Sequence, residues 1–422
     1  MIRFYNGRVL TLGGGFDVTG DEVWTDGGKI SYVGPAREDS PAFEREIDLR
    51  GDLLMPGFKN AHSHTAMTFL RSLADDMPLD RWLREQVWPN EAKLTDEAVY
   101  TFTMLGIMEY LTSGITACFD MYVRNEAFTA ACIRAGFRAV LCSGFNDFDR
   151  DVEQVERDYR KYNALHGLIS FRLGIHAEYT TSMDRLEYMA GLAEKYHEPC
   201  FTHLSETRAE VDGCLERYGL TPPQLLDRVG LFRYGGGGFH CVHMSEEDVA
   251  LFAEKGLWAV TNPASNLKLA SGVAPLARLQ RAGVKLAIGT DGAASNNALD
   301  MFREMYLASV LQKLREDDPS VGHADAVLEM ACVGGARAMG LTACDDLAVG
   351  KKADLIVIDL RRPNMQPIHH VARNLVYAGS KENVRLTMVG GRVLYEDGDF
   401  FIGETPEDIY AAAGDFLRGL RL

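Results

Sequence analysis

Two histidines separated by a single residue are the first candidates for chemistry in this chain. His62 and His64 lie in the segment Asn60-Ala61-His62-Ser63-His64, just after Pro56-Gly57. An extended backbone points residues i and i+2 to the same side, so both imidazoles can converge on one point. Imidazole nitrogen is a standard ligand of zinc and similar divalent metals. Because such a pair can also be incidental, the rest of the sequence has to decide between a metal site and ordinary surface histidines.

Further titratable side chains follow other strand-like runs of the sequence. Of the eleven histidines, six fall at such positions: His62, His64, His176, His203, His240 and His243. Asp291 follows the last run, in Thr290-Asp291-Gly292, where it could also serve as a helix N-cap. We predict that a single metal, with room for a water, is bound by His62, His64, His203 and Asp291.

Glu206 and His240 are the predicted acid–base residues. Glu206 stands three residues beyond His203 and could pass a proton from an activated water to a ring nitrogen, or could simply be a solvated glutamate at a helix start. His240 and His243 cannot both point to one side of a strand, so we predict His240 as the active residue and His243 as supporting or structural. A site with two metals would need a carbamylated lysine as a bridging ligand at the end of the fourth strand, but His176 stands there instead. We therefore expect one metal, with zinc as the first candidate and iron as the second.

The elements that must position these residues alternate between strand and helix. Apolar strand-like runs lie near 52–58, 115–121, 138–145, 170–177, 199–204, 239–244, 257–262 and 285–290. Helical stretches such as 97–112, 125–135, 183–196 and 246–255 separate most of them. This alternation predicts an α/β fold with a parallel (β/α)₈ barrel, whose chemistry collects at the C-terminal strand ends.

Both ends of the chain contain short strand-like runs separated by turn signals. We predict a small β-sandwich built from both termini, formed by residues 1–55 and 346–422, with the metal-dependent barrel at 56–345. Leu53-Leu54-Met55 is predicted to be the buried strand from which the two histidines emerge.

Composition excludes several classes of function. The formal net charge of −16 argues against a nucleic-acid or anionic membrane surface, although not against an anionic small substrate. There is no signal-peptide pattern and no apolar run of roughly 18 residues. The eight cysteines are scattered without Cys-x-x-Cys pairs, so we predict free thiols in a reducing cytoplasm. We also expect a homo-oligomer, either a dimer or a tetramer.

Several motifs together resemble the amidohydrolase superfamily, and more narrowly its S-adenosylhomocysteine/methylthioadenosine deaminase and chlorohydrolase branch. They are Pro56-Gly57-Phe58-Lys59-Asn60-Ala61-His62-Ser63-His64, His203-Leu204-Ser205-Glu206-Thr207, His240-Cys241-Val242-His243, Thr261–Leu269 and Gly289–Asn297. The resemblance implies the same four metal ligands and Glu206 as the shuttle. It further implies that His240 and Ser295 lie near the attacking water and that Asp291 relays a proton. It also implies that Glu91 contacts the ribose and that His176 contacts the substrate. Without the resemblance, Glu91 would be interpreted as a carboxylate at the start of a helix.

Two departures from that branch bear on the substrate. Leu141-Cys142-Ser143-Gly144 lacks the arginine expected to bind a homocysteine carboxylate, and a second expected arginine has only shifted candidates, Arg150 and Arg157. His176 is followed by Ala177-Glu178, where Glu178 could be a polar contact or a rim charge.

The function implied by the resemblance is hydrolytic deamination of an amino-purine, as in adenosine, 5′-deoxyadenosine, 5′-methylthioadenosine or S-adenosylhomocysteine. One alternative is deamination or dechlorination of another N-heterocycle, such as a guanine-like, pterin or s-triazine ring. A non-enzymatic metal-binding homologue is the third interpretation, but it predicts lost ligands and none is lost.

Overall fold

The computed structural model describes residues 1–73 and 75–420 of the chain. Its centre is a sheet of eight parallel strands that pair in chain order. They are β8 (Phe58–Ser63), β9 (Ile115–Asp120), β10 (Arg138–Cys142), β11 (Ile169–Ala177), β12 (Cys200–Leu204), β13 (Gly236–His240), β14 (Trp258–Thr261) and β15 (Lys285–Ile288). The first strand meets the end of the last one, because the Thr290 N–H donates to Asn60 Oδ1 over 2.8 Å and Asn60 Nδ2 donates to Thr290 Oγ1 over 2.7 Å. The predicted (β/α)₈ barrel is confirmed.

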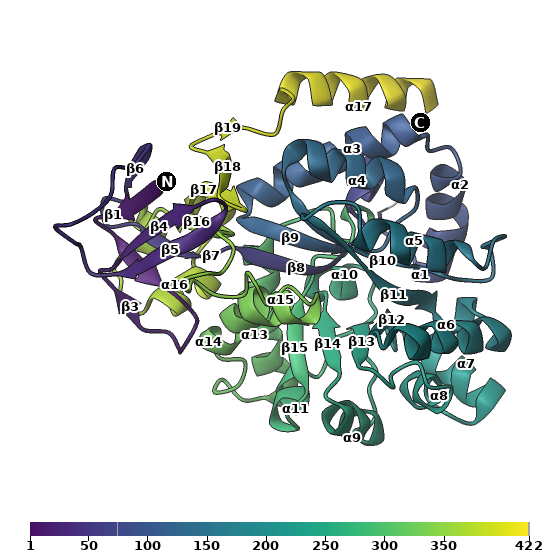
Figure 1. The fold of residues 1–422 in the computed structure, drawn as a ribbon. Coiled ribbons are helices and arrows are strands. Elements are labelled where there is room, and N and C mark those ends of the chain that lie inside the picture. The colour runs from purple at the N-terminus through teal and green to yellow at the C-terminus, as the bar shows by residue number, and fades with distance from the viewer. Residues whose placement is uncertain (74, 421–422) are drawn as a thin grey trace.

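The helices that separate the strands cover the outside of the barrel (Figure 1). They are α3 (Asp96–Thr112), α4 (Asn125–Ala135), α5 (Gln154–Asn163), α6 (Met183–Tyr196), α7 (Arg208–Tyr218), α8 (Pro222–Arg228), α9 (Glu246–Lys255), α11 (Leu276–Arg281) and α13 (Met301–Glu316). Local sequence signals fix where these helices begin and end. Helix α9, for example, begins at a capping box formed by Ser245 and Asp248 and ends at Gly256, whose φ is +61°. In the described part of the chain, no helix is both long and apolar enough to cross a membrane.

The remaining helical segments, most of them short, complete the chain. They are η1 (Thr65–Leu70), α1 (Leu79–Arg81), η2 (Trp82–Val87), α2 (Trp88–Glu91), η3 (Glu178–Thr180), α10 (Pro263–Lys268), α12 (Ala293–Asn296), α14 (Ala324–Glu329), η4 (Met330–Gly334), α15 (Gly335–Ala338), η5 (Pro363–Met365), α16 (Val371–Tyr377), η6 (Lys381–Asn383) and α17 (Pro406–Leu420). Of these, η1, α1, η2 and α2 follow β8 directly. They therefore belong to the end of the barrel where the strands finish.

Two further sheets pack beside the barrel, and both ends of the chain contribute to them (Figure 1). One has the order β5 (Lys29–Gly34), β4 (Glu22–Asp26), β1 (Ile2–Tyr5), β6 (Arg45–Asp48). The other has the order β19 (Asp399–Phe400), β18 (Arg392–Glu396), β17 (Val384–Val389), β16 (Leu355–Ile358), β7 (Leu53–Pro56), β2 (Arg8–Leu10), β3 (Val18–Thr19). A shared core that includes Phe4, Val23, Leu355 and Leu386 joins the sheets, as predicted for a sandwich built from both termini.

The first barrel strand lies further along the chain than predicted. Leu53–Pro56 is β7, which pairs antiparallel with β16 and parallel with β2, so it belongs to the seven-stranded terminal sheet. The barrel strand is β8, which begins after Gly57 and itself contains His62. A Cβ at position 57 would lie 2.1 Å from Thr116 Cγ2, so the chain passes from one sheet to the other through a point where only glycine fits.

Candidate active site

A cavity of about 790 Å³ opens at the ends of the barrel strands. Its lining includes five of the predicted metal-binding and catalytic residues, namely His64, His203, Glu206, His240 and Asp291. This is the end of a parallel barrel at which catalytic side chains are expected, because the loops after the strands converge there.

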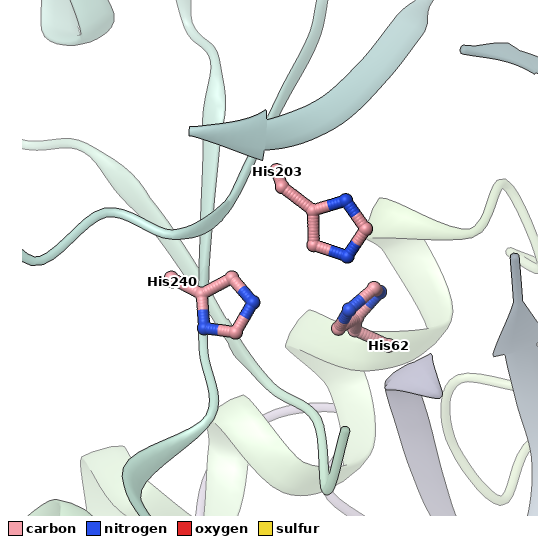
Figure 2. Close-up of side chains that lie close together, drawn as sticks. All are labelled: His62, His203 and His240. Atoms are coloured by element: carbon pink, nitrogen blue, oxygen red, sulfur yellow. The ribbon is translucent and has the colours of Figure 1, made fainter. Parts of the chain in front are cut away.

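Three histidine nitrogens and one carboxylate oxygen meet at this end of the barrel. Asp291 Oδ1 lies 3.3 Å from His64 Nε2 and 3.5 Å from His62 Nε2. His203 Nε2 lies 3.3 Å from His64 Nε2. Figure 2 shows the rings of His62 and His203 turned toward each other, with His240 alongside. His240 also forms a close group with His62 and His203, whose ligand atoms all lie within 4.8 Å of one another.

Hydrogen bonds behind the histidines fix which nitrogen faces the cluster. His203 Nδ1 donates to the carbonyl oxygen of His176 over 2.7 Å, and His64 Nδ1 donates to the carbonyl oxygen of Met121. A carbonyl oxygen only accepts, so each ring carries a proton on Nδ1 and turns its Nε2 toward the cluster. Burial lowers the pKa of His62 to about 3, so this ring is neutral. Although burial alone would lower it, the contact with Asp291 raises the pKa of His64 to about 9, so His64 is the protonated histidine beside this carboxylate.

Asp291 is held in place from its other side. Two hydroxyl groups donate to its Oδ2, from Ser265 over 2.6 Å and from Ser295 over 2.8 Å. Its Oδ1 therefore stays turned toward the histidines. Although burial alone would raise its pKa, the contacts with His62 and His64 hold the pKa of Asp291 well below its usual range, so the carboxylate is ionised.

The donor set fits a divalent metal. His62 is completely buried, yet neither of its ring nitrogens has a hydrogen-bond partner, which is costly unless another group satisfies them. Nitrogen and oxygen donors at this spacing are those that zinc accepts in sites with three histidines or with histidines and a carboxylate.

Glu206 and His240 lie beside this cluster. Burial raises the pKa of Glu206, as suits a carboxyl that takes up and releases a proton. Its Oε2 lies 3.8 Å from His240 Nε2, and Ser271 Oγ donates to its Oε1 over 3.2 Å. His240 Nδ1 donates to Asn266 Oδ1 over 2.7 Å, so His240 Nε2 faces Glu206. The two groups therefore face each other beside the cluster.

Glu91 and His176 line the same cavity further from the cluster. Glu91 ends α2, and burial raises the pKa of this carboxyl to about 6. His176 lies at the end of β11, where Thr180 Oγ1 is 2.8 Å from its Nδ1. Both residues are available to a substrate whose reacting ring lies over the cluster.

Comparison with known proteins decides the family. The model of the Amidohydrolase family matches residues 53–394. The chain belongs to the amidohydrolase family.

Named relatives of this amidohydrolase cover nearly its whole length. A 5-methylthioadenosine/S-adenosylhomocysteine deaminase from Syntrophobacter fumaroxidans is 41% identical over 405 residues, covering 93% of this chain and 92% of that protein. A 5′-deoxyadenosine deaminase from Methanothermobacter thermautotrophicus is 40% identical over 366 residues, which is 85% of each chain. The solved structure of an adenosine deaminase from Xanthomonas campestris, with bound zinc, has a TM-score of 0.94 and 33% identity, covering 100% of this chain and 98% of that one. The predicted family and the prediction of a hydrolytic deaminase are confirmed.

Four residues whose roles the sequence left open lie outside the cavity of this amidohydrolase. Glu178 is buried, and both of its carboxylate oxygens accept from Arg217 Nη2, at 2.8 and 2.7 Å. It is thus neither a substrate contact nor a rim charge, because it pairs with helix α7. His243 Nε2 donates to the carbonyl oxygen of Ser271 over 2.8 Å. Arg150 and Arg157 are exposed and do not line the cavity, and Arg157 pairs with Asp151 and Gln154.

Glu210 is a residue of the site that the sequence reasoning missed. It is buried, and its two carboxylate oxygens accept from the N–H groups of Ser205, over 2.6 Å, and Glu206, over 2.9 Å. Ser205 has a φ of +50°, which a residue with a side chain rarely adopts. Glu210 therefore holds the bend that presents Glu206. The signal was present in Thr207-Arg208-Ala209-Glu210, a Thr-x-x-Glu helix start.

Replacing Glu210 by glutamine is expected to lower kcat about 10-fold. An amide has one acceptor oxygen, so one of the two backbone N–H groups loses its partner and Glu206 loses its fixed position. Metal content and KM should stay close to normal, as measured by elemental analysis and steady-state kinetics. Glu216→Gln, an exposed change on the same helix, is the control. An unchanged kcat in Glu210→Gln would contradict this positioning role.

Proposed function

We propose that this amidohydrolase removes the amino group of an adenosine derivative by hydrolysis, using one zinc ion per chain. The observation that carries the proposal is the cavity, because it joins the histidine–aspartate cluster and Glu206 to Glu91 and His176. A nucleoside fits this arrangement, with the amino-bearing ring over the cluster and the ribose beside Glu91. The names of the relatives support the same substrate class.

A zinc ion held by His62, His64, His203 and Asp291 would supply a water activated for attack at neutral pH. Glu206 accepts a proton and passes it to a ring nitrogen, which makes the amino-bearing carbon electrophilic. His240, oriented by Asn266, polarises the oxygen that develops at that carbon. Asp291 relays a proton to the departing ammonia, and Ser295, which donates to its Oδ2, keeps the carboxylate oriented. Each acid–base step of this kind typically accelerates the reaction about 10²–10⁴-fold.

The 5′ substituent need not be anionic. Ser143, at the position where a carboxylate-binding arginine is expected, has its hydroxyl engaged with the backbone of Gly174: it donates to the carbonyl oxygen over 2.7 Å and accepts from the N–H over 2.8 Å. Neither Arg150 nor Arg157 takes over that role, since neither lines the cavity.

A panel of substrates tests this proposal. We expect adenosine, 5′-deoxyadenosine or 5′-methylthioadenosine to have a kcat/KM at least equal to that of S-adenosylhomocysteine, measured by ammonia release. Loss of a buried bidentate contact to a carboxylate costs about 2–5 kcal/mol of binding free energy. This loss lowers the preference for S-adenosylhomocysteine by roughly 30- to 5,000-fold. A strong preference for S-adenosylhomocysteine that disappears in Arg150→Ala or Arg157→Ala would contradict the assignment. If only guanine-like or triazine rings are turned over, the substrate is not a nucleoside, although the proposed hydrolysis at a ring carbon would still hold.

A further inference from the structure

Two aromatic rings from different loops meet at the outer part of the cavity. Trp88 belongs to α2, and Phe148 lies in the loop after β10. Their ring centroids are 5.6 Å apart with the planes at 57°, and both residues line the cavity. Leu83 and Val155 also line the cavity, so the two rings add to the apolar part of its wall.

Phe148 is unusually exposed for a large apolar residue, because 71% of its surface is accessible. The loop that carries it is nevertheless anchored. Arg185 donates to the carbonyl oxygens of Asn146, over 2.9 Å, and Asp149, over 2.7 Å, and the Ser182 N–H donates to Asp147 Oδ1 over 3.0 Å. An apolar ring held in water loses the free energy that burial would give, and a ligand packed against it would recover that energy.

The charges around the rings are mostly negative. Asp149, Asp151 and Asp158 line this part of the cavity. Among the described lining residues Arg124 is the only arginine or lysine, and its Nη1 lies 2.6 Å from Asp96 Oδ1. Asp151 is paired with Arg157, which does not line the cavity. A substituent ending in a carboxylate would therefore meet Asp149 and Asp158 without a free arginine or lysine among the described lining residues to compensate it.

We propose that Trp88 and Phe148 form an aromatic clamp on the 5′ substituent of the bound nucleoside, which together with Asp149 selects an uncharged thioether or alkyl group over a carboxylate. This inference rests on the proposed function and adds the residues that set its specificity. The rings supply the attractive contact, and Asp149 supplies the repulsion that excludes the competing ligand.

The clamp is tested first by Phe148→Ala, with kinetics on two substrates. We expect KM for 5′-methylthioadenosine to rise about 5- to 20-fold, because the methylthio group loses its packing partner. KM for adenosine, whose 5′ hydroxyl is short and polar, should change less than about 2-fold. Phe148→Tyr keeps the ring and should restore KM for 5′-methylthioadenosine. Phe401→Ala, which removes another half-exposed phenylalanine outside the cavity, is the control.

The charge selection is tested separately by Asp149→Asn. Asparagine keeps the acceptor for the Asn146 N–H, which donates to Asp149 Oδ2 over 2.9 Å, and removes only the charge. We expect kcat/KM for a 5′-(carboxyalkylthio)adenosine, whose substituent carries a carboxylate but no ammonium group, to rise about 3- to 10-fold relative to 5′-methylthioadenosine, with a smaller gain at high salt.

The outcomes separate the clamp from the function on which it rests. Equal changes of KM for both substrates in Phe148→Ala, or an unchanged preference in Asp149→Asn, would overturn the clamp while the deaminase remains. If the unaltered enzyme releases ammonia from no adenosine derivative, the proposed function fails, and the clamp fails with it.

Discussion

Glu206→Gln is expected to lower kcat by at least about 100-fold while the metal content stays unchanged. Glutamine keeps the size and shape of the side chain, and its amide can still contact Ser271, whose hydroxyl lies 3.2 Å from Glu206 Oε1. It has no basic carboxylate, however, so it cannot take a proton from water and deliver it to the ring nitrogen. Steady-state ammonia release and elemental analysis on the same preparation measure both quantities.

The contrast with Glu210→Gln makes this test specific. Both glutamates are buried, but only Glu206 lines the cavity, so its loss should be much larger than that of Glu210. Near-normal turnover in Glu206→Gln would show that another group beside the cluster moves the proton.

The second large effect is expected from His203→Ala. The unaltered protein, purified without added metal, should contain one tightly held divalent metal per chain, zinc first and iron second. Loss of an outer-shell partner already weakens metal binding about 10- to 100-fold, so removal of a direct ligand should leave the purified variant without metal and without measurable turnover. Chelation should likewise abolish activity, and added zinc should restore it.

His369→Ala, an exposed histidine far along the chain from the cluster, is the matched control and should keep its metal. Two metal equivalents per chain, retained in His203→Ala, would contradict the single site built from His62, His64, His203 and Asp291.

Much of this architecture was accessible from the sequence because local signals and long-range ones agreed. The helices 125–135, 183–196 and 246–255 were predicted with the ends that the structure gives them, since caps and periodicity mark helices locally. The cluster could be anticipated because strand ends of a parallel barrel converge, so residues distant in sequence share one rim.

What could not be predicted depends on partners that no local pattern identifies. Leu53–Pro56 and Phe58–Ser63 are both buried strands, and only the pairing with β16 and β2 assigns the first to the terminal sheet. Glu178 looked like a group of the site, but it turns to Arg217 on a helix that follows the next strand. The cytoplasmic location and the homo-oligomer stay predictions.

The pairing of β7 with β16 also has a consequence for how the protein is made. The strand at residues 53–56 leads through one glycine into the strand that carries His62, but its antiparallel partner lies at 355–358. At a synthesis rate of about 5–20 residues per second, this partner follows roughly 15–60 s later. During that interval the backbone N–H and C=O groups along one edge of β7 have no partner strand. Other nascent chains could pair with this exposed edge. Ribosome-bound chains truncated before residue 355 should therefore need a chaperone more than full-length chains do.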